Sequence, residues 1–444
     1  MGIKWKKALK MKNKINIFWF RRDLRLDDNV GFYKALNGKF PVMPIFIFDI
    51  EILDPLQKDD ARVTFIHITL QEMREKLLYI CGSSIGIYHG KPLDVFKQLI
   101  QDFEVQNVIT NHDYEPYAQQ RDKQVDDFLS KKNVGFYTFK DQVIFEKDEI
   151  VKEDGTPYLV FTPFMRKWKE QFKKQPFKIY SSKPYLKNCL TKIELPNVTL
   201  ENIGFTLSNI EVPEFNLSKQ LIQEYENSRN LPAIKGTSYL GTHLRFGTLG
   251  IRQVMEKAIE EKNEVFWNEL IWREFFMQIL YHFPETHTLS FKKKYDRIVW
   301  RNNETDFEKW KTGTTGFPLV DAGMRQLNET GWMHNRVRML VGSFLCKHLL
   351  IDWRWGEAYF AEKLLDYEMA SNIGNWQWVA GCGVDAAPYF RIFNPTTQIE
   401  KFDKDKTYIK LWVKEFQTPL YPKEMVNHKV ARERALKTYK EAIS

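Results

Sequence analysis

Residues 364–394 read LLDYEMASNIGNWQWVAGCGVDAAPYFRIFN, a combination that is unusual for a surface helix. The stretch gathers carboxylates, amides, tryptophans and glycines: Asp366, Glu368, Asn372, Asn375, Trp376, Trp378, Gly374, Gly381 and Gly383. Carboxylates and amides offer acceptors and donors to a planar polar heterocycle, glycines let the backbone approach it closely, and tryptophans supply flat walls. Because tryptophan is also often buried in plain cores, composition alone leaves a tryptophan-rich core turn equally open.

A family resemblance favours the ligand site. The stretch resembles the flavin-binding and substrate-binding end of the photolyase and cryptochrome family, and the resemblance extends over residues 15–439. It is closest to the class I members that repair cyclobutane pyrimidine dimers in DNA. The resemblance implies FAD as cofactor, an α/β N-terminal domain with a doubly wound parallel sheet, and an all-α C-terminal FAD-binding domain.

Length and composition bound the protein class. A chain of 444 residues is too long for one compact core and indicates two or three domains. An aromatic content of 15% favours a protein that handles flat ligands or bases, and 66 basic against 57 acidic residues are compatible with a phosphate-binding face. Since no apolar run approaches the roughly 20 residues of a membrane span and no signal peptide precedes the first predicted strand, we expect a cytoplasmic protein, and from the family a monomer.

Cysteine and histidine patterns do not indicate a metal site. The four cysteines, Cys81, Cys189, Cys346 and Cys382, form no CxxC pair and are interpreted as reduced packing residues. None of the nine histidines has a second ligand at metal spacing, and His334 is expected to be buried and hydrogen-bonded.

The N-terminal part alternates between predicted strands and helices. Strands are predicted at 15–20, 42–48, 85–89, 108–110 and 134–139, and helices at 29–36, 60–80, 92–103 and 117–131. Strict alternation predicts a parallel sheet with helices on both faces, in a domain covering 15–140. The basic lead at 1–14 is interpreted as a tail rather than a nucleic-acid-binding arm, with Met11 as an alternative natural start.

The rest of the chain has a different pattern. Residues 141–209 are rich in Lys, Pro, Ser and Asn and are predicted to be an interdomain linker with one patterned island at 159–168. Residues 210–444 are predicted to form a helical FAD- and DNA-binding domain, because apolar residues recur there at spacings of three and four. Its clearest predicted helices are 266–280, 318–328, 332–350 and 356–369.

The motif WFRRDLRLDDN at 19–29 follows the first predicted strand. Ligands often bind at this edge of a parallel sheet, but ion pairs also fix loops there. The family resemblance favours a structural role. No GxGxxG follows the strand, so no dinucleotide site is predicted.

Gly236, Thr237 and Ser238 form a small-residue turn before a predicted helix. Amides and hydroxyls at a helix start can cradle phosphate, although many helix caps look the same. The resemblance places Arg252 nearby and implies that the FAD pyrophosphate is bound by Tyr225, Thr237, Ser238 and Leu240. The family usually has serine where Gly241 stands, which puts one hydroxyl contact in doubt.

Substrate contacts are also implied by the resemblance. Glu269 and Trp272 share a helix face, and the family makes Glu269 the partner of the damaged base and Trp272 a plate on which it stacks. Further substrate or DNA contacts are implied for Arg229, Asn335, Arg336, Met339 and Trp378, with both arginines on flanking phosphates. Salt-bridged surface residues and core methionine would be the commoner explanation of the residues alone.

For the flavin, the resemblance assigns Asn372 to the central-ring nitrogen, and Asp366 and Glu368 to the pyrimidine edge and ribityl chain. Arg338 is expected to pair with Asp366, because a buried carboxylate needs a counter-charge. Three tryptophans match the family's photoreduction chain: Trp376, Trp353 and Trp300. Each of them could also be plain core packing.

These residues predict light-driven repair of cyclobutane pyrimidine dimers in UV-damaged DNA by electron transfer from excited reduced FAD. A blue-light receptor is disfavoured by Asn372, Trp272 and Met339, and a (6-4) photoproduct photolyase by Asn335 and Met339. A passive flavin-binding protein associated with DNA is the third alternative. A second, antenna chromophore is common in the family; Tyr117 and Ala118 depart from the folate pattern, which leaves a deazaflavin, a flavin or none.

Overall fold

The computed structural model describes residues 11–444, with side chains from residue 14 onwards. Most of the predicted basic lead, including Met1, lies outside the described residues. The chain forms two compact units. The first contains residues up to 144, 176–212 and 243–254, and the second contains 145–175, 213–242 and 255–444. The predicted linker therefore contributes to both units, and the domain boundaries at 140 and 209 stay predictions.

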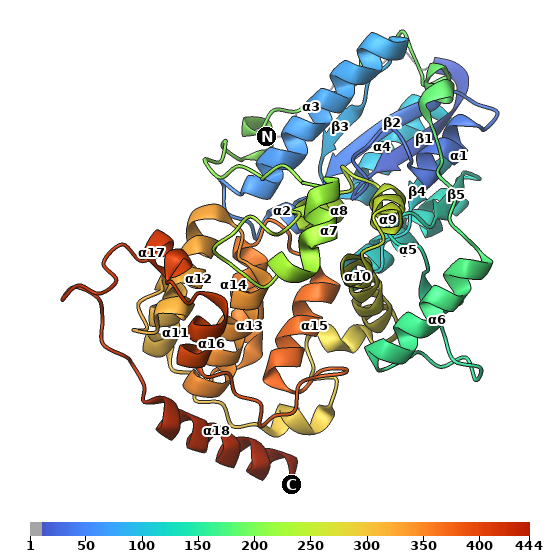
Figure 1. Cartoon of the computed structure of the whole chain (residues 1–444). Helices are drawn as coiled ribbons and strands as arrows, with labels where there is room; N and C mark the ends of the chain where they lie inside the picture. Colours follow the sequence, from blue (N-terminus) through green and yellow to red (C-terminus); the bar gives the residue numbers. More distant parts are fainter. Residues whose placement is uncertain (1–10) are drawn as a thin grey trace. The chain divides into compact units, whose positions relative to one another are not determined.

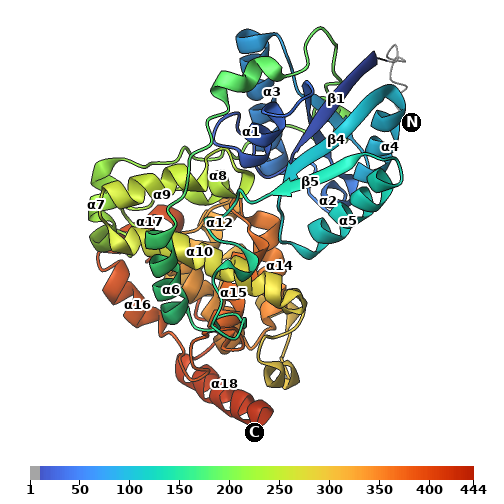
Figure 2. The same cartoon turned by 90° about the vertical axis from the view of Figure 1, so that its right-hand side faces the viewer.

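The first unit is built on a five-stranded parallel sheet with the strand order β3-β2-β1-β4-β5 (Figures 1 and 2). The strands are β1 Met11–Phe20, β2 Val42–Phe48, β3 Gly86–His89, β4 Phe103–Asn111 and β5 Gly135–Phe139. The helices between them are α1 Val30–Leu36, α2 Ile50–Leu53, α3 Ala61–Cys81, α4 Pro92–Asp102 and α5 Pro116–Ser130. The α/β prediction is confirmed.

Both faces of the sheet are buried, as the side-chain alternation of β1 requires. Phe18 and Phe20 pack in one core with residues of α1 and α3. Ile15, Ile17 and Trp19 pack in another core with residues of α4 and α5. Because successive side chains of β1 enter different cores, its register against the neighbouring strands is fixed.

Strand β4 is longer than the sequence predicted. It begins at Phe103, whereas the prediction began at Val108. Glu104, Gln106 and Asn107 interrupt the apolar run, but Glu104 and Asn107 still pair with Lys14 and Asn16 of β1, and a register shift passes over Gln106. The side-chain pattern therefore missed a segment that backbone hydrogen bonds hold in the sheet.

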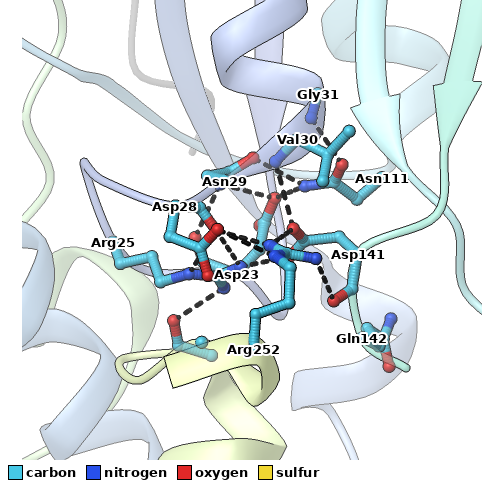
Figure 3. Close-up of polar contacts among 12 residues, drawn as sticks. Asp23, Arg25, Asp28, Asn29, Val30, Gly31, Asn111, Asp141, Gln142 and Arg252 are labelled. Atoms are coloured by element: carbon cyan, nitrogen blue, oxygen red, sulfur yellow. Dashed lines mark hydrogen bonds and ion pairs between the residues drawn. The ribbon is translucent and has the colours of Figure 1, made fainter. Parts of the chain in front are cut away.

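The motif at 19–29 is structural, as expected. Arg25 donates to Asp141 at 2.6 Å, and Asp28 accepts from the Nε of Arg252 at 2.8 Å (Figure 3). The α1 backbone N–H of Val30 also bonds to Asp141, at 3.0 Å. These contacts join the loops after β1 and β5 to the start of helix α9, Ile251–Glu260, and all the residues involved belong to the first unit.

The second unit is helical (Figure 1). Its helices include α6 Phe161–Lys174, α7 Lys219–Ser228, α10 Glu264–His282, α11 Glu304–Thr312, α12 Pro318–Thr330, α13 Asn335–Ser343, α14 Trp353–Lys363, α15 Met369–Ala380, α16 Pro395–Phe402, α17 Thr407–Trp412 and α18 His428–Ile443. Two further helices, α8 Leu240–Phe246 and α9 Ile251–Glu260, each have residues in both units. Between residues 11 and 444, no helix is long and apolar enough to cross a membrane.

Two predicted helices of this unit differ from the structure. The one predicted at 332–350 begins at Asn335 and continues after Ser343 as a π-helix, Phe344–Leu349. The one predicted at 356–369 is wrong over 364–368, where the N–H of Leu365 bonds to the carbonyl of Gly331 instead of continuing the helix. This break between α14 and α15 carries Asp366 and Glu368, two of the predicted ligand contacts.

Candidate functional site

A cavity of about 390 Å³ lies within the second unit, between α10, α13, α14, α15 and the break before α15. Its size is typical of small-molecule sites. Many of the predicted residues line it: Arg229, Glu269, Trp272, Asn335, Arg338, Met339, Asp366, Glu368, Asn372, Trp376 and Trp378. The others do not line it: Tyr225, Thr237, Ser238, Leu240, Arg336, Trp353 and Trp300.

One wall holds the predicted pair of Asp366 and Arg338. Two guanidinium nitrogens of Arg338 donate to the two carboxylate oxygens of Asp366 at 3.1 and 2.9 Å. The Nε of Arg338 donates to the carbonyl of Met333 at 2.7 Å, and this bond fixes the orientation of the guanidinium group. A planar, oriented cation beside an acceptor suits the carbonyl and N–H groups of a heterocycle edge.

Gly241 makes room for this pair. A Cβ at position 241 would lie 2.7 Å from the Cβ of Asp366 and 2.8 Å from its Oδ2. Real Cβ atoms do not approach that closely, so the glycine lets α8 and the carboxylate lie against each other. A serine, which the family usually has at this position, would collide with Asp366 where it lies in this structure.

Asn372 is oriented by a carboxyl that the sequence interpretation missed. Its amide nitrogen donates to the Glu357 carbonyl at 3.2 Å and to Glu357 Oε1 at 2.9 Å. With the nitrogen held, the amide oxygen is the atom that Asn372 can offer to a ligand in the cavity. Burial raises the pKa of Glu357 despite hydrogen bonds from Asn372 and Tyr367. Glu357 lies one turn beyond Trp353 on α14, and only the fold brings it to Asn372.

Trp272 is held face to face with a residue of the predicted linker. The Phe161 ring lies 3.7 Å from the Trp272 ring at an interplanar angle of 7°. Phe161 is the first residue of α6, and its backbone N–H donates to Asp385 Oδ2 at 3.0 Å. The patterned island at 159–168 was the available signal, but nothing in the sequence indicated which residue Phe161 would contact.

Glu269 and Arg229 form an ion pair with an Nη1–Oε1 distance of 2.5 Å. The guanidinium of Arg229 also lies over the ring of Tyr225, 5.2 Å from its centroid. Burial and the nearby Glu269 raise the pKa of Tyr225 to about 12, so its hydroxyl stays protonated. The charges of Glu269, the predicted base contact, and Arg229, a predicted phosphate contact, therefore neutralise each other in this structure.

On α13, Asn335 and Met339 line the cavity, while Arg336 points elsewhere. Arg336 donates to Asn230 Oδ1 at 2.6 Å and lies over the ring of Phe402 at 4.4 Å. His334 caps the helix by accepting from the backbone N–H of Arg336 at 3.1 Å, and burial with two neighbouring arginines lowers its pKa to about 4. The expectation of a buried histidine is confirmed, and the expected hydrogen bond is present at Nδ1, while the buried Nε2 has no hydrogen-bond partner among the described residues.

The turn at 236–239 has unusual backbone. Tyr239 adopts a φ of 53°, which is rare for a bulky side chain and typical of functional turns. A Cβ on Gly236 would lie 2.7 Å from the Cβ of Ser228, so a glycine is required there. Arg252, expected nearby, is instead buried in the first unit on Asp28 and Asp141 (Figure 3). Its guanidinium is fully engaged by these carboxylates and the backbone, and its expected place near the turn stays a prediction.

Trp376 and Trp353 are buried in the same core, and Trp300 packs against it. Gly356 on α14 lets the Trp376 ring approach closely, since a Cβ there would lie 2.1 Å from that ring. The ring centroid of Trp376 also lies 5.0 Å from that of Phe360 and 6.2 Å from that of Trp310. Trp310, absent from the sequence prediction, adds a second aromatic contact to the ring on the cavity wall.

The cavity residues fit a flavin. Trp376 supplies an aromatic wall, Arg338 and Asp366 a paired donor and acceptor, and Asn372 an oriented amide oxygen. Gly342 lines the same space, where a Cβ would lie 3.1 Å from Val379. Within residues 11–444, no group of three or more His, Cys, Asp or Glu side chains is placed to hold a metal ion.

Comparison with known proteins agrees with this site. A model of the FAD binding domain of DNA photolyase matches residues 266–419, and a DNA photolyase model matches residues 16–182. A curated relative from Synechococcus sp., deoxyribodipyrimidine photo-lyase, is 36% identical over 93% of this chain and 90% of its own length. Two solved structures are also similar over nearly their whole length.

The first is a bacterial class III photolyase from Agrobacterium tumefaciens, with a TM-score of 0.86, 32% identity, and coverage of 98% of this chain and 99% of that chain. The second is an archaeal photolyase from Sulfolobus tokodaii that contains two FAD molecules, with a TM-score of 0.81, 34% identity, and coverage of 96% and 100%. Similarity of this extent and level, together with the flavin-compatible cavity, shows that the chain belongs to the DNA photolyase family of FAD-binding enzymes.

Proposed function

We propose that this chain repairs cyclobutane pyrimidine dimers in DNA in a light-driven reaction, as a deoxyribodipyrimidine photo-lyase. The observation that carries the proposal is the composition of one cavity. Groups suited to a flavin, such as Arg338 and Asn372, share its wall with Glu269, Trp272 and Met339, which suit a pair of bases. A flavin and flipped-out bases can therefore lie side by side in it.

The chemistry requires electron transfer, because acid–base groups do not readily break the carbon–carbon bonds of a cyclobutane ring. Reduced FAD, excited by blue light, would supply the electron and recover it after the ring opens. The chain itself holds the cofactor, orients the substrate and excludes water.

The proposed cofactor contacts are those that the family resemblance implies, and the hydrogen bonds of Arg338 and Asn372 support two of them. The Asn372 oxygen accepts a hydrogen bond from the central-ring nitrogen, while Arg338 and Asp366 bind the pyrimidine edge and Glu368 the ribityl chain. The pyrophosphate contacts are proposed for Tyr225, Thr237, Ser238 and Leu240, beside the strained backbone of Tyr239.

The proposed substrate contacts are made by polar and by apolar side chains. Glu269 and Asn335 hydrogen-bond the bases, and Trp272, Trp378 and Met339 pack against them. Arg229 and Arg336 bind flanking phosphates, so binding weakens with salt. Flipping a dimer out costs a few kcal/mol, less than for intact bases that are better stacked, which favours damaged sites.

Trp376, Trp353 and Trp300 are proposed to carry electrons from the surface to the flavin. Support comes from the burial of the first two in one core and from the partial exposure of Trp300 beside it. We also propose that the protein acts as a monomer, which light scattering of the eluting protein tests.

One observation disfavours repair of (6-4) products. The resemblance associates that activity with histidines around Asn335 and Met339, and among the described residues no histidine lines the cavity. A receptor function is disfavoured by Asn372, because plant receptors of the family usually have aspartate there and animal receptors cysteine.

A second chromophore other than folate is part of the proposal. Tyr117 occupies a position where folate-using members of the family have a different residue. Its hydroxyl donates to Asp49 at 2.5 Å, so the Tyr117 side chain is already engaged. The Sulfolobus relative's two FAD molecules make a flavin a reasonable occupant. Acid extraction should give more than one flavin, or a deazaflavin, per chain; a single FAD and nothing else would exclude the antenna.

The deciding experiment uses duplex DNA with one defined cyclobutane dimer, chemically reduced protein, and blue light or darkness. A matched duplex with one (6-4) product is treated in parallel. We expect loss of the cyclobutane lesion only, and only in light. Absence of repair by flavin-loaded protein that still photoreduces would favour the receptor function.

A further inference from the structure

Trp300, the outermost tryptophan of the proposed electron route, is held against the segment that leads to Trp353. The backbone N–H of Arg301 donates to the carbonyl of Leu350 at 2.8 Å, just before Trp353 in the chain. Trp353 and Trp376 are buried, whereas Trp300 is partly exposed and packs against their core from outside. Of the three proposed tryptophans, Trp300 is therefore the one that a molecule in solution can reach.

The short 3-10 helix η5, Lys293–Arg297, lies next to Trp300. The ring of Tyr295 in η5 and the ring of Trp300 both pack against Tyr439, at centroid distances of 6.2 and 5.8 Å. Val299, between η5 and Trp300, is 79% exposed. These elements form one surface, called here the η5 surface, which consists of η5, Val299 and Trp300.

Three cations of the η5 surface have no acidic partner. They are exposed and all belong to η5: Lys293, Lys294 and Arg297. None of the ion pairs formed by residues 14–444 involves these three side chains. Their charge is therefore available to an anion from solution.

The acidic side chains beside this surface are already paired. Asp296 of η5 accepts from Arg354 at 2.5 Å, and Arg354 also donates to Asp352 at 3.1 Å. Asp306 accepts from Arg301 at 3.2 Å. The two arginines face three carboxylates, and the three cations of η5 leave the neighbourhood of Trp300 with a surplus of positive charge.

We propose that the η5 surface binds a small anionic reductant, which returns an electron to Trp300 after photoreduction. The proposal rests on the proposed electron route through Trp376, Trp353 and Trp300. Positive potential beside a reaction partner raises the local concentration of an anion and its rate of encounter by roughly tenfold or more at low salt. Val299 adds an exposed apolar contact for the body of the reductant.

The electrons balance with one reductant molecule for each electron that reaches the flavin. Light moves one electron from Trp376 to the cofactor, and Trp353 and then Trp300 each pass one electron inward. Trp300 is left as a radical cation. The reductant gives it one electron, so the indole becomes neutral again and the reductant leaves oxidised by one electron. Without this step the electron returns to Trp300 and photoreduction is lost.

Nucleic acid is the other anion that such a surface can attract, because lysine and arginine neutralise phosphates. A duplex lying over Trp300 would close the one proposed tryptophan that solution reaches. The position of the cations at the outer end of the electron route therefore favours a small reductant, and DNA binding becomes an outcome of the test.

The test uses flavin-loaded full-length protein and three donors that share one redox group: ferrocenecarboxylate, an anion; ferrocenemethanol, which is neutral; and (ferrocenylmethyl)trimethylammonium, a cation. A laser flash on the oxidised flavin forms the tryptophan radical, and its decay at rising donor concentration gives a second-order rate constant for each donor. Each constant is divided by its own value in 1 M salt, which removes differences in donor strength.

We expect this ratio to be largest for the anion and smallest for the cation, with about tenfold between them at low salt. The screening length is about 30 Å at 0.01 M salt and about 3 Å at 1 M, so the effect of charge should vanish in between. The triple variant Lys293→Glu/Lys294→Glu/Arg297→Glu should reverse the order of the donors. If that variant is unstable, Lys293→Gln/Lys294→Gln/Arg297→Gln should bring the three ratios together.

The control makes the same change of net charge at exposed positions of the first unit, in the triple variant Lys123→Glu/Lys131→Glu/Lys132→Glu, which should keep the order of the donors. Equal ratios for the three donors in the unaltered protein, or an equal effect of the control variant, would overturn the proposal. So would an unchanged donor order in the η5 variant that instead loses affinity for undamaged DNA, a result that assigns the surface to DNA.

Failure of the electron route is recognised separately. If Trp300→Phe leaves the radical kinetics unchanged, the route does not end at Trp300, and the proposed reductant site is rejected with it. If Trp300→Phe abolishes the long-lived radical but donor charge has no influence, only the reductant site is rejected. Dimer repair by chemically reduced protein should be the same in the unaltered protein and the η5 variant, because it needs no electron from Trp300.

Discussion

The guanidinium of Arg229 and the carboxylate of Glu269 lie 2.5 Å apart on the cavity wall, with side chains that are 21% and 36% exposed. A partly exposed ion pair contributes little net stability, about 0–1 kcal/mol. A DNA phosphate can therefore compete for Arg229, and the same event frees Glu269 for a base. We expect phosphate binding and base binding to be coupled through this pair.

Glu269→Ala tests the base contact. Losing a hydrogen bond to a charged group costs about 1.5–3 kcal/mol, which predicts a tenfold or larger fall in repair at unchanged FAD content. Repair per absorbed photon and flavin absorbance are the measurements. Glu264→Ala is the control, because Glu264 lies on the same helix and pairs with Lys169 away from the cavity. Equal repair by both variants would remove Glu269 from the substrate contacts.

Phe161→Leu tests the stack behind Trp272. Aromatic pairs contribute about 0.5–1.5 kcal/mol beyond their area, so binding of dimer-containing DNA should weaken severalfold while undamaged DNA binds as before. Phe161→Tyr should keep the affinity. Phe172→Leu removes another stacked ring of α6, the one on Trp168, and should have no effect on the dimer. Affinity lost equally in both leucine variants would mean a general effect of α6.

Trp353→Phe tests the proposed route of electrons to the flavin. Light-driven bleaching of the oxidised flavin band should stop, while chemically reduced protein still repairs dimers. Trp355→Phe is the matched control on the same helix. If Trp353→Phe bleaches normally, the route instead passes through Trp310, whose ring lies 6.2 Å from that of Trp376.

Gly241→Ser tests whether this glycine is matched to Asp366. Because the new Cβ would meet Asp366 at 2.7 Å, we expect the Asp366–Arg338 pair to shift and the FAD-to-protein absorbance ratio to fall. Gly241→Ala separates the causes: equal loss in both variants indicates the Cβ clash, whereas better retention by serine indicates a useful hydroxyl. Full FAD retention by both would show that the two elements move apart without cost.

Much of the first unit could be predicted from sequence, because its strands are continuous apolar runs between punctuating loops. Val42–Phe48 is buried at every position and was predicted to the residue. The polar part of β4 was missed, because Glu104 and Asn107 break the apolar pattern although both residues pair with β1. The predicted helix at 356–369 ran through its break for a related reason, since the carbonyl that binds the N–H of Leu365 belongs to Gly331, which follows the end of α12 far away in the sequence.

The sequence predicted which residues form much of the candidate site, but only some of the contacts between them. Asp366 and Arg338 were paired in advance, because a buried carboxylate needs a counter-charge. Glu357 and Phe161 were not found, since a glutamate on a helix and a phenylalanine in a linker carry no local sign of the side chains they orient. The partners of Arg252 were not found either, because Asp28 and Asp141, which bind its guanidinium, are more than 100 residues away in the sequence.

Those carboxylates give a prediction for the stability of the first unit. Burial acts to raise the pKa of Asp141, but Arg25 and Arg252 outweigh it and lower the pKa from 3.8 to about 2. Since the folded pKa is below the unfolded value, this stabilisation is complete above about pH 4 and is lost as the pH falls toward 2. The shift corresponds to about 2 kcal/mol at neutral pH.

Asp141→Asn should therefore lower the free energy of unfolding at pH 7 by at least that amount, and by about 3–5 kcal/mol because two buried guanidiniums lose their shared counter-charge. Urea unfolding followed through the first unit, repeated between pH 7 and pH 2, measures the difference. The gap between the two proteins should narrow only below pH 4. Asp154→Asn, at an exposed position, should leave the midpoint unchanged. A gap that stays constant down to pH 2 would mean that Asp141 acts through its shape and hydrogen bonds, since only the charge is lost on protonation.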